Sequence, residues 1–84
     1  MRYPILIEPG DDTHAFGVTV PDLPGCFSAG DTLDETLINA EEAVAAWIDA
    51  TLDDGHAIPR ASDLASLTVP AGWVVCWMHF KGLR

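Results

Sequence analysis

The sequence has little positive charge. Four Lys and Arg residues stand against thirteen Asp and Glu, which gives a formal net charge of −9 at pH 7. Between Tyr3 and Pro59 there is no Lys or Arg, whereas twelve of the thirteen acids lie there. Because such a surface repels phosphate backbones, we expect no direct nucleic-acid binding by this chain. The same charge attracts a basic protein, although it also serves solubility alone.

Long apolar runs and cysteine motifs are also missing. The longest stretch without a charged side chain, residues 64–80, is broken by Pro70 and Gly72, which excludes a membrane-spanning helix. The N-terminal residues contain no export signal, so we expect a cytoplasmic protein. Cys26 and Cys76 form no Cys-X-X-Cys pair, so we expect two free thiols rather than a zinc or thioredoxin-type site.

The 84 residues leave room for one domain, residues 1–84, with a thin hydrophobic core. Three short segments are rich in strand-forming residues, and turn-forming residues separate them. These segments are Tyr3–Glu8, Ala15–Val20 and Cys26–Gly30. Because antiparallel strands accept such short connections, we expect the three segments to form an antiparallel sheet.

One long helix is predicted after these strands. Thr32 stands three residues before Glu35, which is a capping box: the hydroxyl takes the Glu35 amide proton and the carboxylate returns to the Thr32 amide. Gly55 suits the left-handed residue that follows a helix. Helical spacing places one apolar stripe along this segment, formed by Leu33, Leu37, Ala40, Val44, Trp47 and Ile48.

A further strand is predicted at Trp73–Phe80. Because this segment follows the helix, we expect a right-handed crossover back into the sheet. The chain order is then β-β-β-α-β, an α+β fold. The segment carries more apolar area than so small a domain easily hides, which favours a homodimer or homotetramer; burial under the helix explains it equally well. The candidate interface residues are Trp73, Val75, Trp77 and Phe80.

Three runs of residues resemble the HicB family of bacterial antitoxins: Phe16–Glu35, Ala40–Ala43 and Gly55–Pro59. The signature lies in Val20–Glu35, where a strand end, a Pro-Asp-Leu-Pro-Gly-Cys loop, a short strand and a capped helix follow one another. The resemblance extends over Pro4–Pro59, about two thirds of the chain. It implies a partial ribonuclease H-like fold.

The resemblance also implies a partner and a function. HicB proteins neutralise HicA, a small basic toxin with a double-stranded-RNA-binding-like fold that cleaves messenger RNA. We therefore expect a non-enzymatic antitoxin that covers a basic HicA-type toxin and needs no cofactor. Many relatives carry a C-terminal DNA-binding segment, but four residues follow Phe80, so we expect no such segment in this chain. The candidate toxin-binding acids are Asp11, Asp12, Asp22, Glu41 and Glu42.

A ribonuclease H-like scaffold leaves a second hypothesis open, a metal-dependent nuclease or hydrolase. Glu8, Asp11 and Asp12 cluster in and beside the first predicted hairpin, and two-metal phosphoryl chemistry needs converging carboxylates. Aspartates in a turn, however, usually form hydrogen bonds with their own backbone. We therefore predict no metal site, and we expect Cys26 to pack inward rather than to act as a nucleophile.

Overall fold

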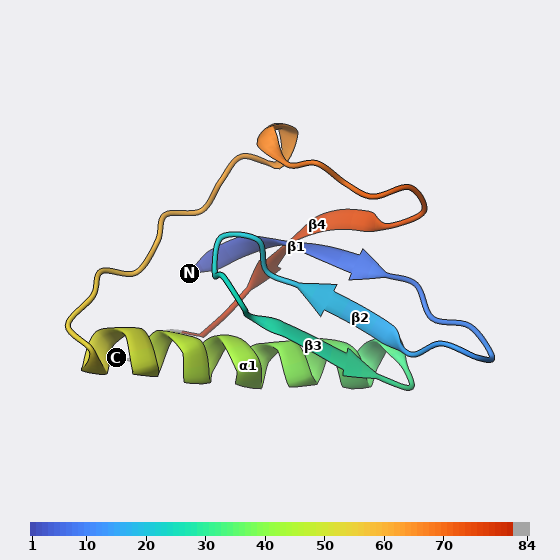
Figure 1. The fold of residues 1–84 in the computed structure, drawn as a ribbon, viewed down its shortest axis with the longest axis horizontal. Coiled ribbons are helices and arrows are strands. Elements are labelled where there is room, and N and C mark those ends of the chain that lie inside the picture. The colour runs from blue at the N-terminus through green and yellow to red at the C-terminus, as the bar shows by residue number, and fades with distance from the viewer. Residues whose placement is uncertain (82–84) are drawn as a thin grey trace.

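A four-stranded sheet and one long helix form the protein, shown as a computed structural model in Figure 1, which describes residues 1–81. The elements are β1 (Arg2–Glu8), β2 (Phe16–Thr19), β3 (Phe27–Gly30), α1 (Leu33–Asp53), a short 3-10 turn η1 (Leu64–Ser66) and β4 (Val74–His79). The strand order is β3-β2-β1-β4, and every neighbouring pair is antiparallel. The predicted α+β fold with the order β-β-β-α-β is confirmed.

β4 joins the sheet as an edge strand beside β1. The handedness rule for crossovers applies to parallel strands, whereas β4 runs antiparallel to β1 over six residue pairs, from Arg2 opposite His79 to Ile7 opposite Val74. The expected right-handed crossover is therefore wrong. Instead, residues 56–73 form a return segment, and in the view of Figure 1 the strands lie between this segment and α1.

Pro4 lies within β1, a central strand, where a missing N–H would normally break the ladder. Met1 and Phe80 exchange both backbone hydrogen bonds, at 3.2 and 2.8 Å, which fixes the alternation between β1 and β4. By that alternation, the nitrogen of Pro4 faces the β2 side. The pairing between β1 and β2 begins only at Leu6. If the same register continued, Pro21 would lie opposite Pro4. Because the two strands do not pair at this position, neither proline removes a hydrogen bond from the sheet.

Alternation along the strands divides the sheet into two faces. One face packs on α1 and forms the core, made of Tyr3, Ile5, Val18, Val20, Leu23, Cys26, Ala40, Val44, Ile48 and Phe80. The predicted inward packing of Cys26 is thereby confirmed. On the opposite face Leu6 of β1 is 8% exposed, whereas Phe27 of β3 is 70% exposed. The face away from α1 is therefore covered near β1 and bare over β3.

The predicted start and end of α1 are confirmed, and of the two predicted capping-box bonds the one to the Thr32 hydroxyl is present. The Thr32 hydroxyl accepts a hydrogen bond from the Glu35 amide at 3.1 Å, which satisfies one of the unpaired amides of the first turn. At the other end Gly55 has φ of +78°, and its amide donates to the carbonyl of Leu52 at 3.0 Å. This is the left-handed C-terminal geometry that favours glycine.

The predicted apolar stripe of α1 is right in its middle and wrong at its start. Its buried members are Ala40, Val44 and Ile48. Leu33 is 39% exposed, and Thr36 is fully buried in the first turns instead. Its hydroxyl donates to the Thr32 carbonyl at 2.7 Å, so the buried polar atom is satisfied. No helix among residues 1–81 is both long and apolar enough to cross a membrane.

Candidate protein-docking site

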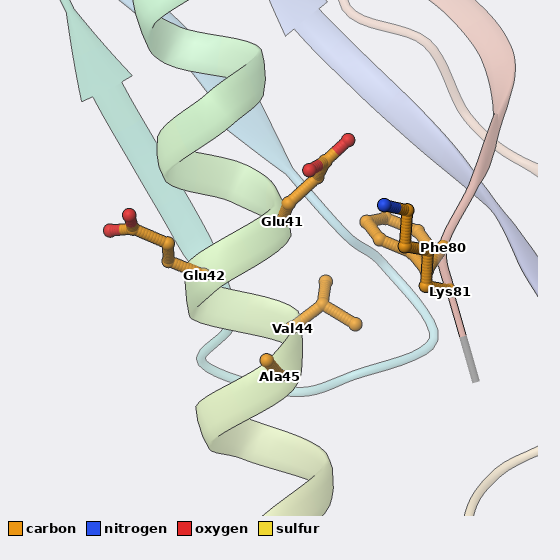
Figure 2. A pocket seen from close by; sticks show the side chains of 6 residues that line it. All are labelled: Glu41, Glu42, Val44, Ala45, Phe80 and Lys81. Carbon is orange, nitrogen blue, oxygen red and sulfur yellow. The ribbon is translucent and has the colours of Figure 1, made fainter. Parts of the chain in front are cut away.

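A pocket of about 220 Å³ opens between α1 and the end of β4 (Figure 2). Its lining residues are Glu41, Glu42, Val44, Ala45, Phe80 and Lys81. Figure 2 shows Glu41 and Val44 projecting from α1 toward Phe80 and Lys81, while Glu42 points away from them. Two of the five acids that the sequence nominated for toxin binding therefore lie at one hollow.

The floor of this pocket is apolar and fixed by packing. Val44 is fully buried and Phe80 is 7% exposed, both within the core. Phe80 is held at the end of β4 because its amide donates to the Met1 carbonyl at 2.8 Å and its carbonyl accepts from the Met1 amino group at 3.2 Å. The small side chain of Ala45 leaves the space beside them open.

The rim of the pocket is acidic. Glu41 and Glu42 are exposed, and Glu41 lies three residues before Val44, on a neighbouring position of the helix surface. Lys81 is the one base among the lining residues; the Glu41 side chain points toward it, while that of Glu42 points away from it. An apolar floor with an acidic rim suits a Lys or Arg side chain, whose aliphatic stem packs on Phe80 while its head meets a carboxylate.

Asp11 and Asp12 lie elsewhere, at the exposed tip of the β1–β2 hairpin. One carboxylate oxygen of Asp11 accepts from the backbone amides of Thr13 and His14, both at 2.8 Å, and lies 3.0 Å from the His14 Nδ1. The Thr13 amide, followed by the His14 side chain, lowers the pKa of Asp11 below its ordinary value of 3.8. Asp11 therefore shapes this turn, as aspartates in turns commonly do.

Asp22 is engaged within the chain. Its carboxylate accepts from the Ser62 amide at 2.8 Å and from the Ser62 hydroxyl at 2.5 Å. A second bond, from the Tyr3 hydroxyl to the Pro59 carbonyl at 2.6 Å, holds the same return segment to β1. Burial, and then the charge of Asp22, raise the pKa of Tyr3 above 10.0. Asp22 thus joins the β2–β3 loop to the return segment.

The five acids consequently fall in three places: Glu41 and Glu42 at the pocket, Asp11 and Asp12 at the hairpin tip, and Asp22 inside a loop contact. Sequence reasoning did not assign the pocket floor. The helical spacing between Glu41 and Val44 was the one sequence signal for the pocket. It could not show that Phe80 packs against α1, because that packing depends on contacts between distant parts of the chain.

The β4 residues nominated for an oligomer interface divide into two groups. Trp73, Val75 and Trp77 are half-buried, whereas Phe80 belongs to the core and forms the pocket floor. The Arg2 guanidinium lies 4.1 Å from the centre of the Trp77 ring, a cation–π contact. The role of this strand between copies stays a prediction, with Phe80 placed in the chain's own core.

The nuclease hypothesis gains no support from the geometry. Within residues 1–81, no group of three or more His, Cys, Asp or Glu side chains could hold a metal ion. The Asp11 carboxylate, a member of the nominated cluster, serves the hairpin turn. Cys26 is buried, and burial raises the pKa of its thiol, which disfavours the nucleophilic thiolate.

Comparison with solved structures identifies the fold. A chain of the N-terminal domain of Burkholderia pseudomallei antitoxin HicB superposes with a TM-score of 0.79 and 30% identity, over 96% of this chain and 99% of that one. A chain in a HicA3–HicB3 toxin–antitoxin complex superposes with a TM-score of 0.76 and 30% identity, over 98% and 100% of the two chains. The fold is thus that of HicB N-terminal domains.

Sequence comparison gives the family. Residues 3–79 match the family described as HicB-like antitoxin of bacterial toxin–antitoxin system, so the chain belongs to the HicB-like antitoxin family. An uncharacterized 14.9 kDa protein of Haemophilus phage HP1, from its rep–hol intergenic region, is 47% identical over 64 residues, which are 76% of this chain. The chain spans about half of that relative's length, 47%.

Proposed function

We propose that this protein is the antitoxin of a type II toxin–antitoxin system. It binds and neutralises a small basic HicA-type toxin that cleaves messenger RNA, acts in the cytoplasm, and has no catalysis of its own. The observation that carries the proposal is the match of residues 3–79 to HicB-like antitoxins. The similarity to a chain of the HicA3–HicB3 complex supports a toxin as the partner.

Charge explains how such a partner would be captured. An RNA-cleaving toxin must present a basic face to phosphate, and a chain of net charge −9 with no Lys or Arg between Tyr3 and Pro59 is attracted to that face. Because the Debye length falls from about 10 Å at 0.1 M salt to about 3 Å at 1 M, this steering weakens with salt. Apolar contacts must therefore set the off-rate.

The pocket of Figure 2 supplies both kinds of contact in one place. Glu41 provides a carboxylate beside the floor, and the part of Phe80 that stays exposed accepts the aliphatic part of a basic side chain. We assign Asp11 and Asp12 to long-range steering from the hairpin tip, where they are exposed. Asp22 contributes through the loop that it holds, because its oxygens accept from Ser62.

Co-expression tests the proposal. The basic protein encoded beside this one, expressed alone, should stop cell growth, and co-expression of this chain should restore growth and yield a complex that co-purifies. An empty vector serves as the control. If growth stops whether or not this protein is present, and no complex is recovered, the antitoxin proposal is wrong.

The pocket is tested by charge reversal. The double variant Glu41→Lys, Glu42→Lys should bind the toxin roughly tenfold or more weakly, about 1.4 kcal/mol or more. The control Asp54→Lys reverses one exposed charge at the far end of the same helix, about 20 Å away at 1.5 Å per residue. The double variant reverses two charges and the control reverses one, so a loss in the double variant of only about twice that in the control would mean that overall charge, rather than the pocket, provides the affinity.

A further inference from the structure

The pocket of Figure 2 contains a basic side chain of its own. Lys81 lies two residues beyond the end of β4, and its side chain runs along the Phe80 ring with the amine end toward α1. The Glu41 side chain projects from α1 toward the same opening. Lys81 therefore puts an aliphatic stem on the apolar floor and an ammonium on the side of the carboxylate, as a partner's base in this pocket would do.

The backbone that carries this lysine is anchored, whereas its side chain is not. Two hydrogen bonds between Phe80 and Met1, at 2.8 and 3.2 Å, hold the residue before Lys81 beside the helix. The Lys81 side chain is exposed, and in the part of the chain that the structure describes no ion pair joins it to Glu41. The ammonium therefore stays near the carboxylate at a high effective concentration and can still leave.

The charge pattern makes this contact unusual for the chain. No Lys or Arg lies between Tyr3 and Pro59, and residues 64–81 contain no Asp or Glu. The pocket thus brings the acidic part of the sequence against one of its four bases. The Met1 ammonium, a second positive group beside Phe80, is bound to the Phe80 carbonyl. Lys81 is therefore the positive group that the pocket has available.

We propose that Lys81 is an internal competitor for the pocket, which a partner's Lys or Arg side chain must displace. This role rests on the proposed function, since it presupposes that the pocket takes a base of the toxin. Exchange of one base for another at Glu41 leaves the local charge balance unchanged, so the partner gains less than a pocket without Lys81 would give. Because exposed ion pairs contribute little, the competition weakens binding by roughly two- to fivefold.

Such competition serves the specificity of an acidic chain. A net charge of −9 attracts basic polypeptides of every kind. Lys81 lowers the affinity of each of them by the same factor. Partners that offer charge alone are then lost first, whereas a toxin that makes further contacts around the pocket remains bound.

The variant Lys81→Met tests the competition, because it keeps an unbranched apolar side chain on Phe80 and removes the charge. The probe is a triarginine peptide with blocked ends, titrated into the whole chain and followed by NMR at the Ala45 methyl group and the Phe80 ring. Lys81→Met should bind this peptide roughly two- to fivefold more tightly than the wild type. The matched control Arg60→Met removes one exposed base outside the pocket lining and should change the affinity much less.

A second background shows whether Lys81 competes for the Glu41 carboxylate. Glu41→Gln keeps the shape of the side chain and removes its charge. In this background Lys81→Met should tighten peptide binding no more than Arg60→Met does, because the group for which Lys81 competes is gone.

Several results would overturn this inference. Equal gains in Lys81→Met and Arg60→Met would mean that net charge alone acts, and a gain that persists with Glu41→Gln would mean that Lys81 does not compete for this carboxylate. Weaker binding by Lys81→Met, or no shift at Ala45 and Phe80 in any variant, would contradict it equally. The peptide titration does not involve the toxin, so its failure leaves the antitoxin proposal standing, and failure of toxin binding leaves the competition measurable.

Discussion

The variant Asp22→Ala tests whether Asp22 stabilises the fold, as distinct from attracting the toxin through its charge. The change removes the acceptor of two hydrogen bonds from Ser62, one from the backbone amide and one from the hydroxyl. Hydrogen bonds to a charged group contribute about 1.5–3 kcal/mol when sheltered. Because both residues are only half-buried and water can replace the lost acceptor, we expect a total loss of about 1–2 kcal/mol.

Thermal unfolding measures this loss. In a domain of this size, 1 kcal/mol corresponds to roughly 4–8 °C in Tm, so Asp22→Ala should lower Tm by about 5–15 °C. Asp31→Ala is the matched control, since it removes the same charge from an exposed position and should change Tm by little. Ser62→Ala should lose part of the same energy, and the double variant should cost less than the sum of the two single losses.

The outcome that would refute this reasoning is a Tm for Asp22→Ala equal to that of Asp31→Ala. The contact with Ser62 would then contribute nothing to stability, and the return segment would be held by other contacts, such as the bond between Tyr3 and Pro59.

Two further changes test local features. Thr32→Ala should destabilise the domain by about 1 kcal/mol, whereas Thr32→Ser keeps the cap to Glu35 and should cost less; an unchanged melt for Thr32→Ala would place the helix start elsewhere. In an NMR titration Asp11 should protonate below pH 3.8, and His14→Ala should raise its pKa while the Thr13 amide still holds it low. Because the folded-state pKa is depressed, this carboxylate stabilises the fold above 3.8 and the contribution is lost as the pH falls through the folded-state value. A midpoint at or above 3.8 would contradict the turn geometry.

Local chemistry made much of the fold predictable. The alternating residues of β2, the Thr32 cap and the glycine after α1 depend on neighbours in the chain, and each formed as expected. The predicted burial of Leu33 was wrong, because helical spacing alone does not show where the sheet ends along the helix. The buried Thr36 instead lies close against Gly30, where an added Cβ would come within 2.8 Å of its hydroxyl.

The direction of β4 and the composition of the pocket could not be predicted from local sequence features. β4 pairs with β1 across more than sixty residues of chain, so no local signal sets its orientation. The same is true of Phe80, which was nominated for contact between copies and lies in the core beside Val44. Charge patterning found Glu41 and Glu42, but only the packing of two distant elements showed that they border an apolar hollow.

The central claim, that this protein neutralises a basic RNA-cleaving toxin without catalysis of its own, is tested most directly by titrating it into that toxin's cleavage of a messenger RNA. Cleavage should fall to background near stoichiometric amounts, because the acidic chain competes with RNA for the basic face. The chain alone should leave the RNA intact. Undiminished cleavage at a several-fold molar excess of this protein, or cleavage by this protein alone in the presence of Mg²⁺ or Mn²⁺, would contradict the account.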